Sequence, residues 1–200
     1  MHPSIYVQEN FSLIEKRLGY TFKNKELLFQ AFIHRSFVNE NKQNFPSHNE
    51  RLEFLGDSVL GLLVAEYLFE KHPDLPEGKL SYLRSFLVDA KTCALFLQKL
   101  ELDSFLLLGK GERYGEGRGK ETIFADAFEA VMGALYLDGG FEAVKKSFQF
   151  SLQTIVESLL QSPFHNYKAE LQELLQKKYQ KIPVYKVLTE EGPEHHKRFV

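Results

Sequence analysis

Apolar residues recur along this chain at intervals of three and four positions, and few stretches alternate between apolar and polar residues. A period near 3.6 places apolar side chains on one face of a helix, so a mainly α fold is expected. The pattern predicts helices over residues 50–71, 79–100, 122–137 and 141–160, of which the second is either one helix or a pair.

Proline and glycine indicate where these helices end. The segment His72-Pro73 ends the first of them, because proline cannot continue the backbone hydrogen bonding of a helix. Asp138, Gly139 and Gly140 form a stop signal for the third. The segment from Gly109 to Lys120 contains five glycines between charged residues and is predicted to be a loop.

The pattern changes near Pro163, which predicts a first domain over residues 1–162 and a second over residues 163–200. In the second, residues 167–179 form an amphipathic helix, and residues 184–189 have the β-branched and aromatic content of a strand. Residues 196–200 begin a further strand. One helix and one and a half strands cannot close a stable domain, so this module is expected to be truncated.

The distribution of charge says more than the net charge of −2. Residues 1–160 carry a net charge of −4, whereas residues 161–200 carry +2. An acidic body suits a polyanionic partner only where metal cations or local basic patches lie between the two.

The chain contains a single cysteine, Cys93, which excludes an intramolecular disulfide and a cysteine-based zinc site. Its apolar neighbours predict that it fills the core. No stretch has the roughly 20 apolar residues of a membrane span, and the first residues lack the pattern of a signal peptide. A cytoplasmic protein is therefore expected.

Three carboxylates lie on one face of the helix predicted over residues 50–71. Each helical residue advances by about 100°, so Glu50, Glu53 and Asp57 fall within an arc of about 60°. The core-facing positions are predicted to be Leu52, Leu55, Val59 and Leu62.

The helix predicted over residues 122–137 repeats this arrangement. Asp126 and Glu129 are one turn apart, and the predicted buried positions are Phe124, Phe128, Val131 and Leu135. If the two helices pack core to core, four carboxylates come together and favour a hard divalent ion such as Mg²⁺, which suits phosphodiester hydrolysis. The alternative is that each is an ordinary acidic residue on a solvated face.

Four segments resemble the bacterial ribonuclease III family, in the order expected for it. The segment His48 to Ser58 (HNERLEFLGDS) resembles the signature of that family almost letter for letter. The others are residues 31–36 (AFIHRS), 76–81 (PEGKLS) and 122–130 (TIFADAFEA). The resemblance implies an all-helical endonuclease domain that cuts double-stranded RNA, leaves 5′-phosphates and short 3′ overhangs, and processes ribosomal and other structured RNA precursors.

Carried over to this sequence, the resemblance implies that Glu53, Asp57, Asp126 and Glu129 bind metal, with Asp57 and Glu129 as catalytic residues. The implied metal is Mg²⁺, for which Mn²⁺ substitutes. Two further residues, Glu50 and Glu77, match acidic positions that assist near the scissile bond.

The resemblance also implies a homodimer, in which Phe54 inserts into a socket on the partner subunit. Without the family resemblance, Phe54 is interpreted as a half-buried core residue.

The C-terminal segment resembles the first half of a double-stranded RNA-binding domain with an α-β-β-β-α order. The core face of its helix is predicted to consist of Leu171, Leu174 and Leu175. The resemblance implies that RNA is contacted by Gln172, Glu173, Gln176 and His195, which read the shape of the duplex more than its sequence.

Two other features are tempting but are interpreted more simply. His34 has the chemistry of a general base, but it is interpreted as a structural histidine that is held by hydrogen bonds. The glycine-rich segment does not fit a phosphate-binding Walker motif, because Tyr114 stands where a glycine is required. Arg113, Arg118 and Lys120 are expected either to approach RNA phosphates or to belong to a solvated linker.

Two other functions remain open. One is a duplex-RNA binder that does not cut. The other is an unrelated metal-dependent phosphohydrolase of small molecules. Cleavage tests on an RNA duplex, a single strand and a DNA duplex separate both from the first hypothesis.

Overall fold

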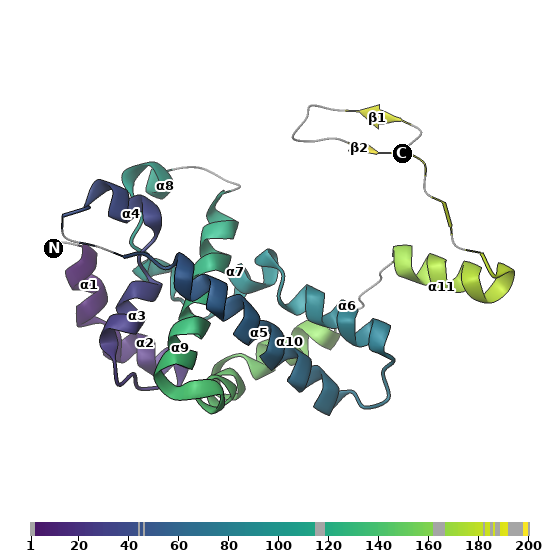
Figure 1. Ribbon diagram of the computed structural model, residues 1–200, viewed down its shortest axis with the longest axis horizontal. Coiled ribbons are helices and arrows are strands. Elements are labelled where there is room, and N and C mark those ends of the chain that lie inside the picture. The colour runs from purple at the N-terminus through teal and green to yellow at the C-terminus, as the bar shows by residue number, and fades with distance from the viewer. Residues whose placement is uncertain are drawn as a thin grey trace. The chain divides into compact units, whose positions relative to one another are not determined.

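The computed structural model describes residues 3–43, 45, 47–114, 119–161, 167–181, 183–184, 186, 189–191 and 198–199. The chain divides into two compact units, Met1–Glu157 and Ser158–Val200. The first consists of helices throughout its described part, as the apolar periodicity predicts (Figure 1). Among the described helices, none combines the length and the apolar character that a membrane span requires.

The described part of the first unit begins with four short helices and continues with helices of varied length. They are α1 Pro3–Glu9, α2 Phe11–Leu18, α3 Lys25–Ala31, α4 Arg35–Glu40, α5 Glu50–Lys71, α6 Glu77–Leu87, α7 Ala90–Lys99, α8 Lys110–Tyr114, α9 Gly119–Ser151 and α10 Gln153–Gln161, with a 3₁₀ turn, η1, over Asp103–Phe105. The last residues of α10 belong to the second unit.

Helix α9 forms the centre of the first unit and packs most extensively against α5, then against α7 (Figure 1). Its buried residues include Phe128, Val131 and Leu135, as predicted, together with a run of alanines. Small side chains allow neighbouring helices to approach closely. Cys93 of α7 is fully buried, and burial raises the pKa of its thiol, so its predicted role as core filling is confirmed.

Most helix bounds agree with the prediction. Helix α5 covers the predicted residues 50–71, and residues 79–100 form a pair, α6 and α7. The predicted break at Gly140 is present, because this residue has a φ of 73° inside α9. A second break at Leu152, between α9 and α10, was not predicted.

The prediction of a loop from Gly109 to Lys120 was wrong for its described residues other than Gly109. Residues 110–114 form α8, and α9 already begins at Gly119. Helix α4 supplies the reason: the Gly109 N–H donates to Ser36 Oγ (2.9 Å), and the Lys110 N–H donates to Glu40 Oε1 (2.8 Å). These partners satisfy backbone donors at the start of α8, and they lie about 70 residues away in sequence.

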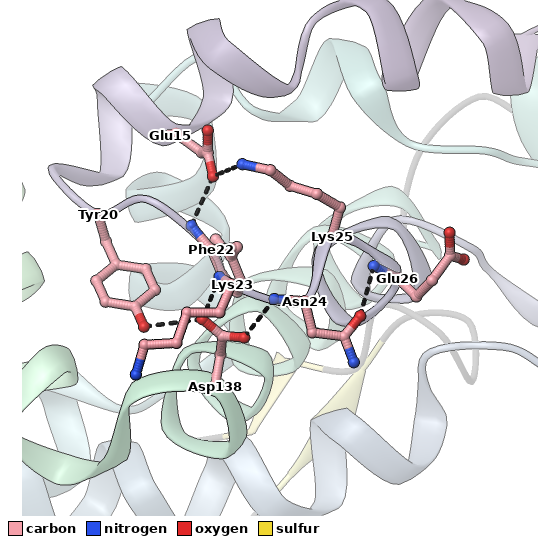
Figure 2. A network of polar contacts seen from close by, with 8 residues as sticks. All are labelled: Glu15, Tyr20, Phe22, Lys23, Asn24, Lys25, Glu26 and Asp138. Atoms are coloured by element: carbon pink, nitrogen blue, oxygen red, sulfur yellow. Dashed lines mark hydrogen bonds and ion pairs between the residues drawn. The ribbon is translucent and has the colours of Figure 1, made fainter.

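The turn between α2 and α3 is fastened to α9 by one carboxylate (Figure 2). Asp138 accepts hydrogen bonds from the Tyr20 hydroxyl and from the backbone N–H groups of Lys23 and Asn24, each at 2.8 Å. On either side of this turn, the buried Glu15 of α2 pairs with Lys25 of α3, and Glu15 also accepts from the Phe22 N–H in the turn (2.6 Å). The start of the chain is thereby held against α9.

The second unit contains α11 Tyr167–Tyr179 and the strands β1 Glu190–Glu191 and β2 Arg198–Phe199, which pair antiparallel. The predicted strand over residues 184–189 was wrong for its described residues, none of which lies in a strand, and Val184 is exposed. The predicted core face of α11 is also wrong in part, because Leu171 and Leu174 are exposed. A pair of two-residue strands is too small to cover an apolar helix face.

Candidate active site

The predicted acidic face of α5 begins at the N-terminus of this helix, which a backbone hydrogen bond holds in place. Asn49, which is buried, donates its N–H to the Ile33 carbonyl (2.8 Å). Glu50 in the first turn forms an ion pair with Arg35 (Nη1–Oε1, 3.3 Å). Glu53 follows one turn later and is partly buried, whereas Asp57 is exposed.

Helix α9 carries the other two carboxylates on its side toward α5. Asp126 and Glu129 are both partly buried and alternate with fully buried residues such as Phe128. The electrostatic influence of Asp57 on Glu129, and of Asp126 on Glu53, places these carboxylates within one cluster. We call Glu53, Asp57, Asp126 and Glu129 the carboxylate cluster.

Two glycines allow α5 and α9 to cross at backbone contact. A β-carbon at Gly56 would lie 1.8 Å from the carbonyl oxygen of Glu129, and one at Gly133 would lie 2.2 Å from that of Leu52. Neither distance is compatible with any residue other than glycine. The crossing therefore lies beside the carboxylate cluster and determines how near its two halves are.

The positioning role of these glycines was missed from the sequence. A signal was present, because glycine inside a helix costs about 1 kcal/mol relative to alanine and usually has a packing reason. Gly56 and Gly133 both lie inside predicted helices.

Three members of the cluster, Glu53, Asp126 and Glu129, lie in surroundings that disfavour their ionised form. Burial, followed by the charges of Asp57, Asp126 and Glu53, raises the pKa of Glu129 to about 7. Burial and the neighbouring carboxylates, Asp126 first, also raise the pKa of Glu53. Burial and Glu50 raise the pKa of Asp126, although Arg35 opposes this effect.

Such a cluster has the donor chemistry of a hard divalent cation. Its ligands are oxygen atoms only, and a cation would relieve the repulsion that raises these pKa values. Within the described part of the chain, no three His, Cys, Asp or Glu side chains are arranged so that they hold a metal ion as they lie.

A cleft of about 590 Å³ opens beside the cluster, and we call it the acidic cleft. It is lined by His34, Arg35, Asn49, Glu50, Glu53, Glu112, Gly119, Thr122, Ile123 and Asp126. Four of these residues are acidic and one is arginine, so a polyanion entering the cleft requires cations. Asp57 and Glu129 do not line it.

His34 has the structural role preferred from the sequence. It is the N-cap of α4, where its Nδ1 accepts from the Ser36 N–H (3.3 Å) and lies 2.7 Å from Ser36 Oγ. Burial lowers its pKa, and the opposing charges of Glu112 and Glu50 do not reverse this.

Glu77, predicted as an accessory acid, stands apart from this arrangement. It begins α6, is exposed, and accepts a hydrogen bond from Ser81 Oγ (2.7 Å). It does not line the acidic cleft, and it is not among the charges that raise the pKa values of the cluster.

Phe54 is the most exposed aromatic residue of α5, with 79% of its surface accessible. Its interpretation as a half-buried core residue is therefore wrong. Leu62 was wrongly predicted to be buried and is 58% exposed, and Phe69 is 73% exposed. These three residues fall within an arc of about 80° on α5, and we call them the apolar strip. The opposite side of the helix faces the core, and its buried residues include Gly56, Leu60 and Leu63.

The predicted RNA-binding residues lie in the second unit. Gln172 is half-buried and Gln176 is exposed on α11. The side chain of Glu173 and all of His195 fall outside the described residues, as does Arg118 of the glycine-rich segment in the first unit.

Comparisons with known proteins agree on one family. The family model described as Ribonuclease-III-like matches residues 24–159. A curated protein named Ribonuclease 3 from Protochlamydia amoebophila is 53% identical over 199 residues, covering 100% of this chain and 82% of the relative. Another from Treponema denticola is 45% identical over 186 residues, covering 92% and 75%.

Solved structures give the same result. The nuclease domain of ribonuclease III from Campylobacter jejuni matches with a TM-score of 0.62 and 42% identity, covering 70% of this chain and 94% of that one. That structure is described as showing flexibility in a region involved in dimer formation.

Proposed function

Because this chain belongs to the ribonuclease III family, we propose that it hydrolyses phosphodiester bonds of double-stranded RNA at a divalent-metal site formed by Glu53, Asp57, Asp126 and Glu129. The observation that carries the proposal is the crossing of α5 and α9 at Gly56 and Gly133, beside which these four carboxylates lie.

The residues of this chain have distinct parts in the proposed reaction. Glu53 and Asp126 line the acidic cleft, where the phosphate of the scissile bond would enter. Asp57 and Glu129 do not line the cleft, and burial together with neighbouring carboxylates raises the pKa of Glu129 to about 7. When bound, Mg²⁺, or Mn²⁺ in its place, supplies activation of water and stabilisation of the leaving oxygen.

Two flanking acids are proposed to assist near the scissile bond. Glu50 lines the cleft and forms an ion pair with Arg35, and its proposed role is to influence how RNA or metal binds there. Glu77, at the start of α6, is proposed to assist near the scissile bond as well.

The proposed active form is a homodimer in which Phe54 enters the partner subunit. An apolar strip of this exposure is unfavourable in water and favours association. In the second unit, Gln172, Glu173, Gln176 and His195 are proposed to contact duplex RNA as the start of a double-stranded RNA-binding domain. A cytoplasmic location and processing of structured RNA precursors complete the proposal.

The test is a cleavage assay with a labelled long RNA duplex, the corresponding single strand and a DNA duplex, each with Mg²⁺ or with chelator. Cleavage confined to the RNA duplex with Mg²⁺ is expected, with 5′-phosphates on the products. Glu129→Gln should abolish it, whereas Glu142→Gln, an exposed change of the same type on α9, should not. Unchanged cleavage by Glu129→Gln would refute the assignment of the site.

A further inference from the structure

A second cleft in the first unit has a composition opposite to that of the acidic cleft. Its volume is about 390 Å³, within the range of small-ligand sites. Its floor is apolar and is formed largely by residues 105–108, which are all buried. Tyr6 and Phe124 add aromatic rings to the lining, and Arg113 and Lys120 add two cations.

The two clefts lie on either side of the same pair of helix ends. Helix α8 contributes Glu112 to the acidic cleft and Arg113 to the second one. The start of α9 likewise contributes Gly119 to the acidic cleft and Lys120 to the second. On these two helices, the acidic Glu112 thus faces the acidic cleft, whereas the basic Arg113 and Lys120 face the second cleft.

Both cations of the second cleft are exposed. Neither Arg113 nor Lys120 forms an ion pair with a described residue. Arg113 donates from Nη2 to the Leu108 carbonyl at 3.4 Å, a long hydrogen bond that orients the guanidinium and leaves its other donors for an anion. With Asp103 as the acidic residue of the lining, the cleft carries a net charge of +1.

The aromatic side of the cleft is pre-formed. The Tyr6 ring stacks on the buried Phe105 ring with centroids 5.6 Å apart and an interplanar angle of 22°. Tyr6 is nevertheless 44% exposed, so part of the side chain remains open. An aromatic platform beside two cations suits a ligand that combines a flat ring with a phosphate.

We propose that this cleft binds a nucleoside monophosphate unit, with the base against Tyr6 and Phe124 and the phosphate at Arg113 and Lys120. Asp103 and Ser104, which also line the cleft, are polar partners for ribose hydroxyls or for amino groups of the base. The unit is either a free mononucleotide or an unpaired nucleotide that flanks an RNA duplex. The second source rests on the proposed function, whereas the first does not.

The first experiment measures binding of adenosine 5′-monophosphate to the whole 200-residue chain in chelator, by calorimetry and by NMR. Adenosine and ribose 5-phosphate should each bind at least about tenfold more weakly, because each lacks one half of the recognised unit. Arg113→Gln and Lys120→Gln should each weaken binding of the nucleotide by about tenfold and leave adenosine unaffected. Lys110→Gln, an exposed change on α8 outside the cleft, is the matched control and should have no effect.

Tyr6→Leu distinguishes the contribution of stacking from that of charge, since it should weaken the binding of the nucleotide and of adenosine by the same factor. The proposal is overturned if the nucleotide binds no more tightly than ribose 5-phosphate, or if Arg113→Gln binds it as the wild type does. Cleavage activity does not enter these measurements, so failure here is distinct from failure of the proposed function.

A second experiment identifies the source of the nucleotide. Blunt RNA duplexes and duplexes with a three-nucleotide single-stranded extension are titrated in chelator at matched salt. If the cleft takes an unpaired nucleotide, the extension should tighten binding severalfold in the wild type and not in Arg113→Gln. If the extension makes no difference while the free nucleotide still binds, the site is assigned to the free mononucleotide.

Discussion

At the scale of single residues, burial and the charges of Asp57, Asp126 and Glu53 make ionisation of Glu129 unfavourable. The folded chain holds the pKa of Glu129 at about 7, above the roughly 4.3 of an unfolded glutamate. Between these values the folded state keeps a proton that the unfolded state releases. Without metal, stability therefore falls as pH rises through this window, and the loss is complete above it.

Glu129→Gln removes this titration. In chelator at pH 8 we expect the variant to be more stable than the wild type by about 1–2 kcal/mol, because solvent screens part of the repulsion, and to lose this advantage near pH 4.5. Thermal unfolding across pH 4.5–8 checks the prediction, with Glu142→Gln as the control. Mg²⁺ should raise the melting temperature of the wild type more than that of Glu129→Gln. An advantage that is independent of pH would contradict the explanation.

Asp138 illustrates a different use of one carboxylate. Burial raises its pKa, but the Lys23 and Asn24 backbone N–H groups and the Tyr20 hydroxyl lower it by more, so the net shift is downward. Burial and the hydrogen bond to Asp138 raise the pKa of Tyr20 to about 12. The ionised Asp138 is thus the form that holds the turn, and its contribution should be lost as pH falls below the ordinary range of an aspartate.

Asp138→Ala leaves three donors without their shared acceptor. We expect a loss of about 2 kcal/mol in the free energy of unfolding, measured by urea titration at pH 7. Asp74→Ala, in the exposed turn after α5, serves as the control and should change stability by less than about 0.5 kcal/mol. Equal losses in the two variants would argue against the fastening role of Asp138.

At the scale of elements, the separation of α5 and α9 determines the site. Gly56→Ala or Gly133→Ala places a methyl group against a backbone carbonyl and forces the helices apart, which we expect to cost about 2–4 kcal/mol. Cleavage should fall together with stability, because the two halves of the carboxylate cluster separate. Gly111→Ala is the control, since α8 leaves open space at that position, and it should be neutral or slightly stabilising. An unchanged melting temperature in Gly56→Ala would refute the close crossing.

At the scale of the whole molecule, the apolar strip on α5 bears on assembly. Phe54→Ser should shift the chain from dimer toward monomer, because it removes an exposed aromatic ring from the proposed interface. Sedimentation equilibrium over a range of concentrations measures this. Phe150→Ser, which changes a ring of similar exposure (68%) on α9, should leave the association constant unaltered. A monomeric wild type, or an equal effect of both variants, would overturn the dimer proposal.

Much of the first unit follows from local patterns in the sequence. The extent of α5, the break at Gly140 and the buried face of Phe128, Val131 and Leu135 depend on periodicity and on backbone chemistry, which act over a few residues. The resemblance around residues 48–58 indicates the family, and together with the resemblance over residues 122–130 it implies the four residues of the carboxylate cluster.

Other features depend on partners that are distant in the sequence, and only the tertiary structure decided them. Helix α8 forms because Ser36 and Glu40 accept its first backbone donors. Periodicity predicts that Leu62 and Leu171 are buried, but both are exposed, because periodicity identifies an apolar face without saying what covers it. The acidic character of the α5 face was thus determined by the sequence alone, whereas its proximity to Asp126 and Glu129 was decided by the packing of Gly56 on Gly133, since backbone contact between two helices is a property of neither helix by itself.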